Sequence, residues 1–237
     1  MKIKIMIGWM LCMLLLAFAG IVYAEDFTFE LTEAASFEDK TDNWSFKASV
    51  PQVSGMYDED EQNLLNDYLL SKLESYKADY AEAVQFGEQS VAEGNDPHFL
   101  YELLWDVVTD SEDYFVFRLS CLYVSASATT MNEYFNLDKH TGRLLKFEED
   151  AVTSPEQMTA IYDQIYAQMK EVNDSGEGMF WLEDEYLELA LGNVPYLNHW
   201  YYNADGDLVI TFDKYEVAPG AMGSPEFVIS AEPAEVG

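Results

Sequence analysis

Residues 99–137 read FLYELLWDVV (99–108), TDSED (109–113), YFVFRLSCLYV (114–124), SASA (125–128) and TTMNEYFNL (129–137). The three long pieces are rich in β-branched and aromatic residues, which favour strands. The first connection holds Asp110, Ser111 and Asp113, which favour a turn. This stretch therefore predicts an antiparallel meander of three strands, around which the rest of the fold is built.

Upstream of the meander, the sequence predicts two strands and a long helix. Residues 27–31 and 44–50 alternate between apolar and polar side chains, as half-buried strands do. Asp58 and Glu61 have the spacing of a helix-capping pair, and acidic residues fill the first turn, where the helix dipole favours them. Leucines and tyrosines then recur every three to four residues, which predicts a helix with one apolar face ending near Val84.

Downstream, the chain predicts a second helix and a group of short strands. Ser154, Pro155 and Gln157 form a helix start, and Gly176 and Gly178 end the apolar periodicity that follows. A short helix is expected at residues 183–191. Strands are expected at residues 200–202, 208–212 and 227–229. The predicted class is α+β, with antiparallel sheets packed against two amphipathic helices.

The predicted organisation has four parts. Residues 1–24 form a signal peptide, because two lysines precede a long apolar run that ends in Val22-Tyr23-Ala24. An uncleaved membrane anchor is the alternative, since the apolar run is about long enough to span a bilayer. Residues 25–98 form an N-terminal lobe, residues 99–230 form a C-terminal lobe, and residues 231–237 form a mobile acidic tail. We therefore expect a secreted or otherwise extracytoplasmic protein.

The charge of the chain limits its partners. With 44 acidic and 12 basic residues, the formal net charge is −32 at pH 7. Phosphate binding needs clustered cations, so nucleic acid is not an expected partner. An anionic membrane would be repelled, whereas a cationic protein would be attracted quickly. Solubility alone is the other explanation of such a charge.

No motif in the sequence predicts catalysis, a metal or a cofactor. His98, His140 and His199 lie outside any metal-ligand spacing, and no nucleophile motif is present. Carboxylate pairs could hydrolyse glycosides, but so many acids produce such pairs by chance. Asp205 lies in what is better explained as a hairpin turn than as a calcium loop. Cys121 is expected to be a buried, inert thiol.

One irregular segment is the candidate binding site. Residues 215–226 lie between two predicted strands and contain two prolines and two glycines, which prevent a regular helix. Binding residues favour loops held by a rigid scaffold. A structural crossover loop is the alternative. The candidate ligand-binding residues are Tyr215, Glu216, Pro219, Met222, Pro225 and Glu226.

This segment also carries a resemblance to a known family. Residues 212–220 and 223–229 resemble the C-terminal signature of the RsiV-type extracellular domain. Residues 202–210, 134–142 and 50–55 resemble other parts of the same family. The resemblance implies an α+β domain outside the bacterial membrane that is not itself catalytic and that binds lysozyme in the family's anti-sigma factor.

From the resemblance we expect a non-catalytic binding protein of the bacterial envelope or exterior, with lysozyme or a similar cationic wall-active protein as its ligand. Few residues precede the apolar run, so we expect no sigma factor as a partner. A membrane is expected only if the signal segment stays uncleaved. The alternatives are a peptidoglycan accessory or glycan-binding module, a lipid binder, and a carboxylate-based hydrolase.

Overall fold

A computed structural model describes residues 26–230, so the predicted signal peptide and acidic tail lie outside the described residues. Its larger sheet has five strands in the order β1-β2-β3-β4-β5. Their bounds are Glu30–Lys40, Trp44–Ser54, Phe99–Asp110, Tyr114–Val124 and Ala128–Asp138. The predicted meander is confirmed, because β3, β4 and β5 pair antiparallel in sequence order.

One pairing in this sheet differs from the antiparallel prediction. Strands β2 and β3 run parallel, with Trp44 opposite Phe99. Helix α1, Glu59–Ala92, connects them and brings the chain back to the same end of the sheet, as parallel pairing requires. The sheet is therefore mixed, and the predicted α+β class is confirmed.

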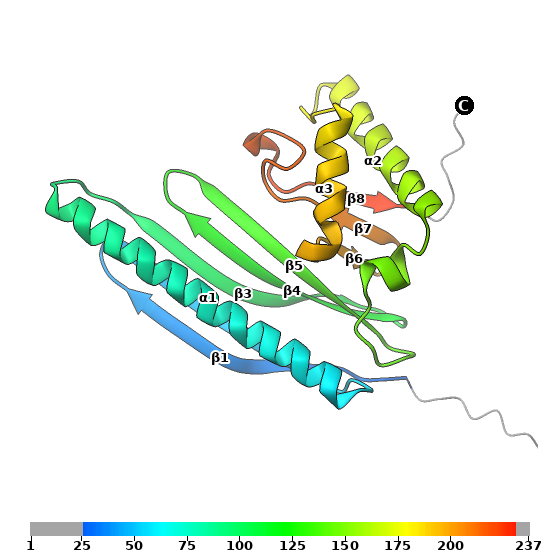
Figure 1. Cartoon of the computed structure of the whole chain (residues 1–237), viewed down its shortest axis with the longest axis horizontal. Helices are drawn as coiled ribbons and strands as arrows, with labels where there is room; N and C mark the ends of the chain where they lie inside the picture. The colour runs from blue at the N-terminus through cyan, green and yellow to red at the C-terminus, as the bar shows by residue number, and fades with distance from the viewer. Residues whose placement is uncertain (1–25, 231–237) are drawn as a thin grey trace, which may run out of the picture.

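Helix α1 runs along the length of this sheet (Figure 1) and covers one of its faces. The predicted cap is present: Asp58 accepts hydrogen bonds from the backbone N–H groups of Asp60 and Glu61. The helix continues past the predicted end at Val84 to Ala92, since the first residue to leave the helical conformation is Gly94, at φ +89°. No helix within residues 26–230 is long and apolar enough to cross a membrane.

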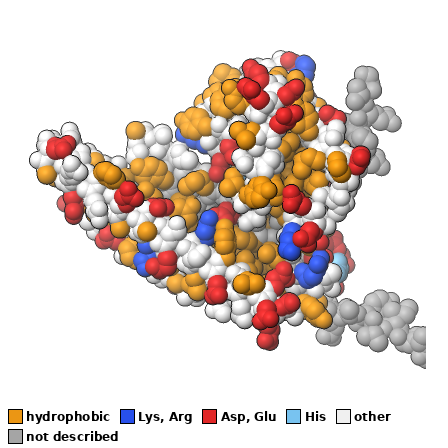
Figure 2. Space-filling model, in the orientation of Figure 1, with side chains coloured by type: hydrophobic (Ala, Val, Ile, Leu, Met, Phe, Trp, Pro, Cys, Tyr) orange, Lys and Arg blue, Asp and Glu red, His pale blue; other side chains and the backbone are white. Residues whose placement is uncertain are grey.

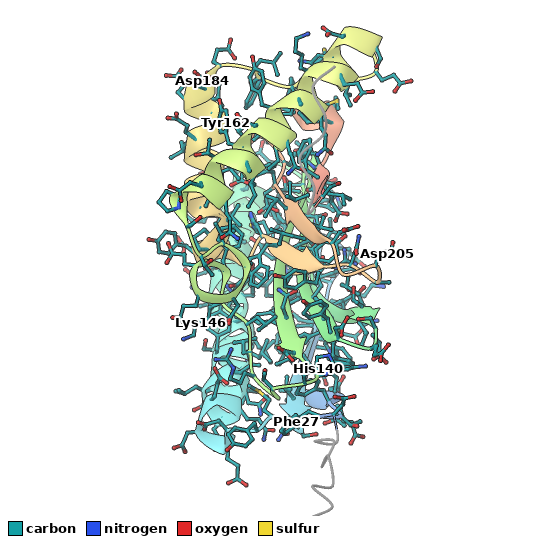
Figure 3. All side chains as sticks on the ribbon, turned by 90° about the vertical axis from the view of Figure 1, so that its right-hand side faces the viewer. Phe27, His140, Lys146, Tyr162, Asp184 and Asp205 are labelled. Atoms are coloured by element: carbon teal, nitrogen blue, oxygen red, sulfur yellow. The ribbon has the colours of Figure 1, made fainter. Side chains whose placement is uncertain are left out.

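The rest of the chain forms a smaller unit of helices over a three-stranded sheet, ordered β6-β7-β8. Helix α2 begins and ends as predicted: it starts at the capping box formed by Ser154 and Gln157 and stops at Gly176, which is in the left-handed conformation. Tyr162 of α2 donates a hydrogen bond of 2.8 Å to Asp184 at the start of α3 (Figure 3). The elements are α2 (Pro155–Ser175), α3 (Asp184–Leu197), β6 (Trp200–Tyr202), β7 (Leu208–Thr211), β8 (Glu226–Ile229) and single π and 3₁₀ turns at Phe147–Ala151 and Gly220–Met222.

Two hydrophobic cores meet at β5. One draws on residues 29–137 and the other on residues 145–229. Alternate side chains of β5 face opposite ways: Phe135 and Leu137 join the first core, whereas Asn136 hydrogen-bonds β6. The lobe boundary predicted at residue 98 falls between two elements of the five-stranded sheet, and the division into lobes stays a prediction.

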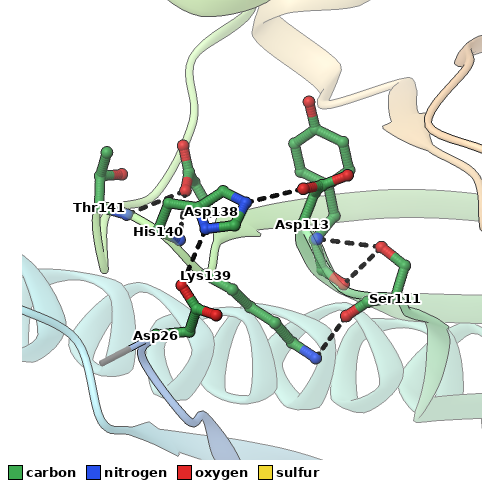
Figure 4. Close-up of polar contacts among 8 residues, drawn as sticks. Asp26, Ser111, Asp113, Asp138, Lys139, His140 and Thr141 are labelled. Carbon is green, nitrogen blue, oxygen red and sulfur yellow. Dashed lines mark hydrogen bonds and ion pairs between the residues drawn. The ribbon is translucent and has the colours of Figure 1, made fainter. Parts of the chain in front are cut away.

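The start of the described chain is tied to the turn after β5. His140 places one ring nitrogen 2.7 Å from Asp113 and the other 2.8 Å from Asp26 (Figure 4). The backbone N–H of Phe27 donates to the carbonyl of Lys139. The hydrogen bonds to Asp113 and Asp26 raise the pKa of His140 to about 9.

This cluster gives a testable titration. We expect the ring of His140 to titrate near pH 9 in NMR spectra, against about 6.5 for a free histidine. Because the pKa of His140 is higher in the folded than in the unfolded state, the contacts of the protonated ring stabilise the fold fully below about pH 6.5. This stabilisation is lost as the pH rises through about 9. Asp113→Asn should lower the midpoint, while Asp184→Asn, at the other end of the molecule from His140 (Figure 3), should leave it unchanged. A wild-type midpoint near 6.5 would show that the cluster does not form.

A candidate partner-binding loop between β7 and β8

The candidate segment forms a closed loop with a fixed base. The backbone N–H of Phe212 donates to the carbonyl of Pro225 at 3.0 Å, just beyond the last β7–β8 pair, Thr211 and Glu226. Inside the loop, Met222 N–H donates to the Pro219 carbonyl and closes the 3₁₀ turn. Figure 1 shows the loop projecting from the small sheet beside α3. The predicted irregular loop is thus held by its own main-chain bonds.

Tyr215 is the exposed aromatic side chain of this loop. It lies at φ +77°, a conformation that few residues other than glycine adopt, and its side chain is 57% exposed. A Cβ on Gly220 would lie 2.4 Å from Cζ of the Tyr215 ring, so only glycine leaves room for the ring there. Backbone conformations of this kind persist where the surroundings hold them, often at functional sites.

Next to Tyr215 lies a hollow of about 430 Å³ with aromatic walls. Trp181 and Tyr186 pack together with ring centroids 5.1 Å apart. The backbone N–H of Trp181 donates to the carbonyl of Val217 at 2.9 Å, which fixes this wall to the loop. The lining residues are Trp181, Tyr186, Leu189, Ala190, Asn193, Tyr215 and Glu216.

A buried acid–histidine group supports the loop from below. His199, which is 3% exposed, lies 3.5 Å from a carboxylate oxygen of Asp213 and 3.5 Å from one of Glu216. The same Glu216 oxygen accepts the backbone N–H of Asp213 at 2.6 Å. Burial raises the pKa of Asp213, the nearby His199 lowers it, and Glu216 raises it further.

The raised pKa of Asp213 predicts a pH-dependent stability. The folded state binds the proton of the Asp213 carboxyl more tightly than the unfolded state does. The stabilisation of the folded state by this proton is therefore complete below about pH 4 and is lost as the pH rises through about 6. We expect Asp213→Asn to be more stable than the wild type at pH 8 by about 1 kcal/mol, and the difference to vanish near pH 4. Thermal unfolding across this range is the measurement. A difference independent of pH would contradict this account.

The other predicted site residues are engaged with the scaffold. Met222 packs against the core of the smaller unit, close to Gly178. Glu226 accepts hydrogen bonds from the hydroxyl groups of Tyr134 and Tyr201 at 3.2 and 3.1 Å. Pro219 and Pro225 accept the bonds that shape the loop. Tyr215 and Glu216 line the hollow together, and the binding role of all six stays a prediction.

Sequence reasoning missed several residues around the loop. Lys214 places its Nζ 5.0 Å from the Tyr215 ring centroid, and it also donates to the carbonyl of Ala128. Trp181 comes from a connection without any motif. His199 precedes a strand and reaches the loop only through tertiary structure. The sequence signal available was Gly220 itself, a residue without a side chain that directly follows Pro219 in the irregular segment.

Comparison with known proteins supports the family seen in the loop. The family described as "Protein of unknown function (DUF3298)" matches residues 150–232, which contain the whole loop. The anti-sigma-V factor RsiV of Bacillus subtilis is 28% identical over 193 residues. Residues 150–232 therefore carry an RsiV-like DUF3298 domain. The match covers 81% of this chain but only 65% of RsiV.

Two crystal structures share the DUF3298 fold. A DUF3298 protein from Bacteroides fragilis superposes with a TM-score of 0.54 at 13% identity, over 86% of this chain and 90% of that one. A DUF3298 protein from Pseudomonas aeruginosa gives a TM-score of 0.50 at 14% identity, with the same coverage. The predicted family resemblance is confirmed, and these two structures establish the fold alone.

Proposed function

We propose that this protein is a non-catalytic binding module that works outside the cytoplasm, and that the loop 215–226 binds a cationic wall-active protein, with lysozyme as the leading ligand. The observation that carries the proposal is the exposed Tyr215, held at positive φ between Lys214 and an aromatic hollow. Aromatic anchors of this kind dominate the energy of protein interfaces. RsiV, an anti-sigma factor by name, supports a binding role rather than catalysis.

Charge supports a cationic partner. The formal net charge is −32, and Figure 2 shows acidic side chains spread over the face that carries the loop, with basic side chains in a few separate places. A surface with so much negative charge accelerates the encounter with a basic protein. At low salt this attraction is only weakly screened. Binding should therefore form quickly and should weaken as the salt concentration rises.

The acidic residues near the loop fit a supporting role better than a catalytic one. Asp213 and Glu216 face the buried His199, and Glu216 also receives the backbone N–H of Asp213. Within residues 26–230, no three side chains among His, Cys, Asp and Glu gather as metal ligands would. We therefore propose that this group shapes the loop instead of attacking a substrate.

The test of the proposal is capture on immobilised c-type lysozyme. Succinylated lysozyme is the matched control, because succinylation reverses the charge of the lysine side chains. We expect this protein to bind the native lysozyme, to bind the succinylated form at least about tenfold more weakly, and to dissociate faster in high salt. Equal binding to both forms would show that the positive charge of lysozyme does not drive binding. Binding to neither form would show that lysozyme is not the ligand.

A second candidate function is glycan binding, and the aromatic hollow is what favours it. Trp181 and Tyr186 offer flat apolar walls, and Asn193 and Glu216 add polar groups, a combination typical of small-ligand sites. Soluble peptidoglycan fragments should then quench the tryptophan fluorescence in a saturable way. Trp181→Ala should abolish that change, whereas no change with wild-type protein would discard this candidate.

A further inference from the structure

One half of strand β5 has an open edge. The backbone N–H of Tyr134 donates away from β4 to the carbonyl of Asn198, and the carbonyl of Asn136 likewise accepts from Leu145. Backbone groups of alternate residues in a strand point to the same side, so those of Thr130 and Asn132 also point away from β4. Beyond residue 133, backbone groups of the smaller unit and of the turn after β5 pair with this edge. Over Ala128–Asn132 no backbone group among residues 26–230 pairs with it, and only the side chains of Lys214 and Asp213 reach it, at the carbonyl of Ala128 and the N–H of Asn132.

A cleft of about 360 Å³ lies along this open half. On one side it is lined by Ala128, Thr130 and Asn132, the residues of β5 whose backbone groups point outward. On the other side the loop contributes Lys214, Gly220, Gly223 and Ser224. A Cβ on Gly223 would meet nothing within 4 Å, so this side of the cleft is open at Gly223.

The cleft holds polar groups in need of partners. Oδ1 of Asn132 is buried and, among residues 26–230, has no hydrogen-bond partner, which is rare for a buried polar atom. No main-chain bond within the same residues pairs the outward groups of Thr130. The carbonyl of Ala128 is occupied by a side chain, the Nζ of Lys214 at 2.8 Å. An open strand edge is a template for another strand, and a lysine placed on it is a common guard.

We propose that this cleft receives an extended backbone segment of the cationic partner, which adds as a sixth strand beside β5. The inference rests on the proposed function for the nature of the partner. The incoming strand would pair with the outward groups of Thr130 and would supply a donor to Oδ1 of Asn132. Lys214 would leave the carbonyl of Ala128 and remain over the ring of Tyr215.

The charges around the cleft favour a basic segment over a second copy of this chain. The carboxylate of Asp213 faces the backbone N–H of Asn132, and Glu133 lies close enough to act on the pKa of Asp213. Two copies that each carry a formal net charge of −32 repel one another. A basic strand would instead be attracted by this net charge. It would find Asp213 beside the edge and a cation, Lys214, already bound to the carbonyl of Ala128, whereas Glu133 is already paired with Lys72.

The backbone of Thr130 provides a matched pair of variants. Thr130→Pro removes the outward N–H and is compatible with an edge position, where proline costs no bond within the sheet. Thr130→Val changes the same side chain but keeps the N–H. The probe is a capped peptide of four Lys-Val repeats, compared with the same peptide N-methylated at alternate residues along one edge. Circular dichroism spectra and thermal unfolding of both variants check that the fold is kept.

We expect the unmethylated peptide to bind the wild type and Thr130→Val alike, and to bind Thr130→Pro about tenfold more weakly. Methylation should cause a similar loss with the wild type. Lys214→Ala, which uncovers the carbonyl of Ala128, should bind the peptide more tightly. If Thr130→Pro fails to fold, the methylated peptide and Lys214→Ala still decide the matter.

The outcomes separate this inference from the proposed function. The sixth strand would be overturned if lysozyme binds but the peptide does not. It would also be overturned if peptide binding is unaffected by methylation and by Thr130→Pro. Both results leave the proposed function standing. If the peptide binds with the expected pattern and lysozyme does not bind, strand addition in the cleft is supported. Lysozyme is then rejected as the protein that supplies the strand.

Discussion

Asn136→Ala should lower the free energy of unfolding by about 2–4 kcal/mol, a large effect for a single polar side chain. The side chain is 1% exposed and joins the two sheets: it donates to the carbonyl of Trp200 at 3.1 Å and accepts the N–H of Tyr202 at 3.0 Å. Alanine would leave both backbone groups of β6 buried without partners, and each costs about 1–3 kcal/mol. Urea unfolding followed by tryptophan fluorescence measures the change.

The same strand supplies the control for this prediction. Asn132 lies four residues away on the same side of β5, and its Oδ1 has no partner within the described residues 26–230. Asn132→Ala makes the same chemical change and should cost less than about 1 kcal/mol. Equal losses for the two variants would show that the bonds of Asn136 do not hold the sheets together.

Gly220→Ala should weaken lysozyme binding by at least about tenfold, or about 1.4 kcal/mol, without unfolding the protein. The new Cβ would lie 2.4 Å from Cζ of Tyr215 and 2.5 Å from Cε of Lys214. Both are outer parts of flexible side chains, so they would move and the fold would remain. The binding surface would then lose the position of its exposed aromatic anchor.

Gly192→Ala is the matched control, since a Cβ there meets nothing within 4 Å in helix α3. It should bind lysozyme as the wild type does, and alanine in a helix should slightly raise its stability. Surface-based binding measurements on the two variants, with thermal unfolding alongside, give the comparison. Wild-type affinity for Gly220→Ala would show that the position of Tyr215 does not matter.

The local signals in the sequence predicted the elements well because they act within a few residues. The Asp58 cap, the Ser154 capping box and the stop at Gly176 each depend on neighbours along the chain, and all three are present. The meander followed from turn residues between strand-forming runs. The end of α1 was placed too early, because its apolar periodicity weakens near Val84 although no residue breaks the helix before Gly94.

Features that depend on distant contacts could not be predicted. The parallel pairing of β2 with β3 is decided by how α1 returns the chain, and nothing in either strand marks it. The sequence around Asn136 shows only a polar residue in a strand, and its bonds to β6 appear with the fold. In the sequence, His199 lies outside any metal-ligand spacing, and its place between two carboxylates appears only with the fold.

The candidate loop was predicted from its prolines and glycines, but its chemistry was not. The prediction gave Met222 a contact role, and the structure packs that side chain toward the core. The positions of the Tyr215 ring and of the Lys214 side chain depend on the absence of a side chain at Gly220. These contacts join Lys214 and Tyr215 to Gly220 across the loop, and the order of residues along the chain does not reveal them.

The most direct test of the central claim is a calorimetric titration of residues 25–237 with a c-type lysozyme at moderate salt, with Tyr215→Ala titrated in parallel. We expect saturable heat from a stoichiometric complex at micromolar concentrations, and binding at least about tenfold weaker for Tyr215→Ala. No heat and no complex with the wild-type protein at those concentrations would contradict the central claim.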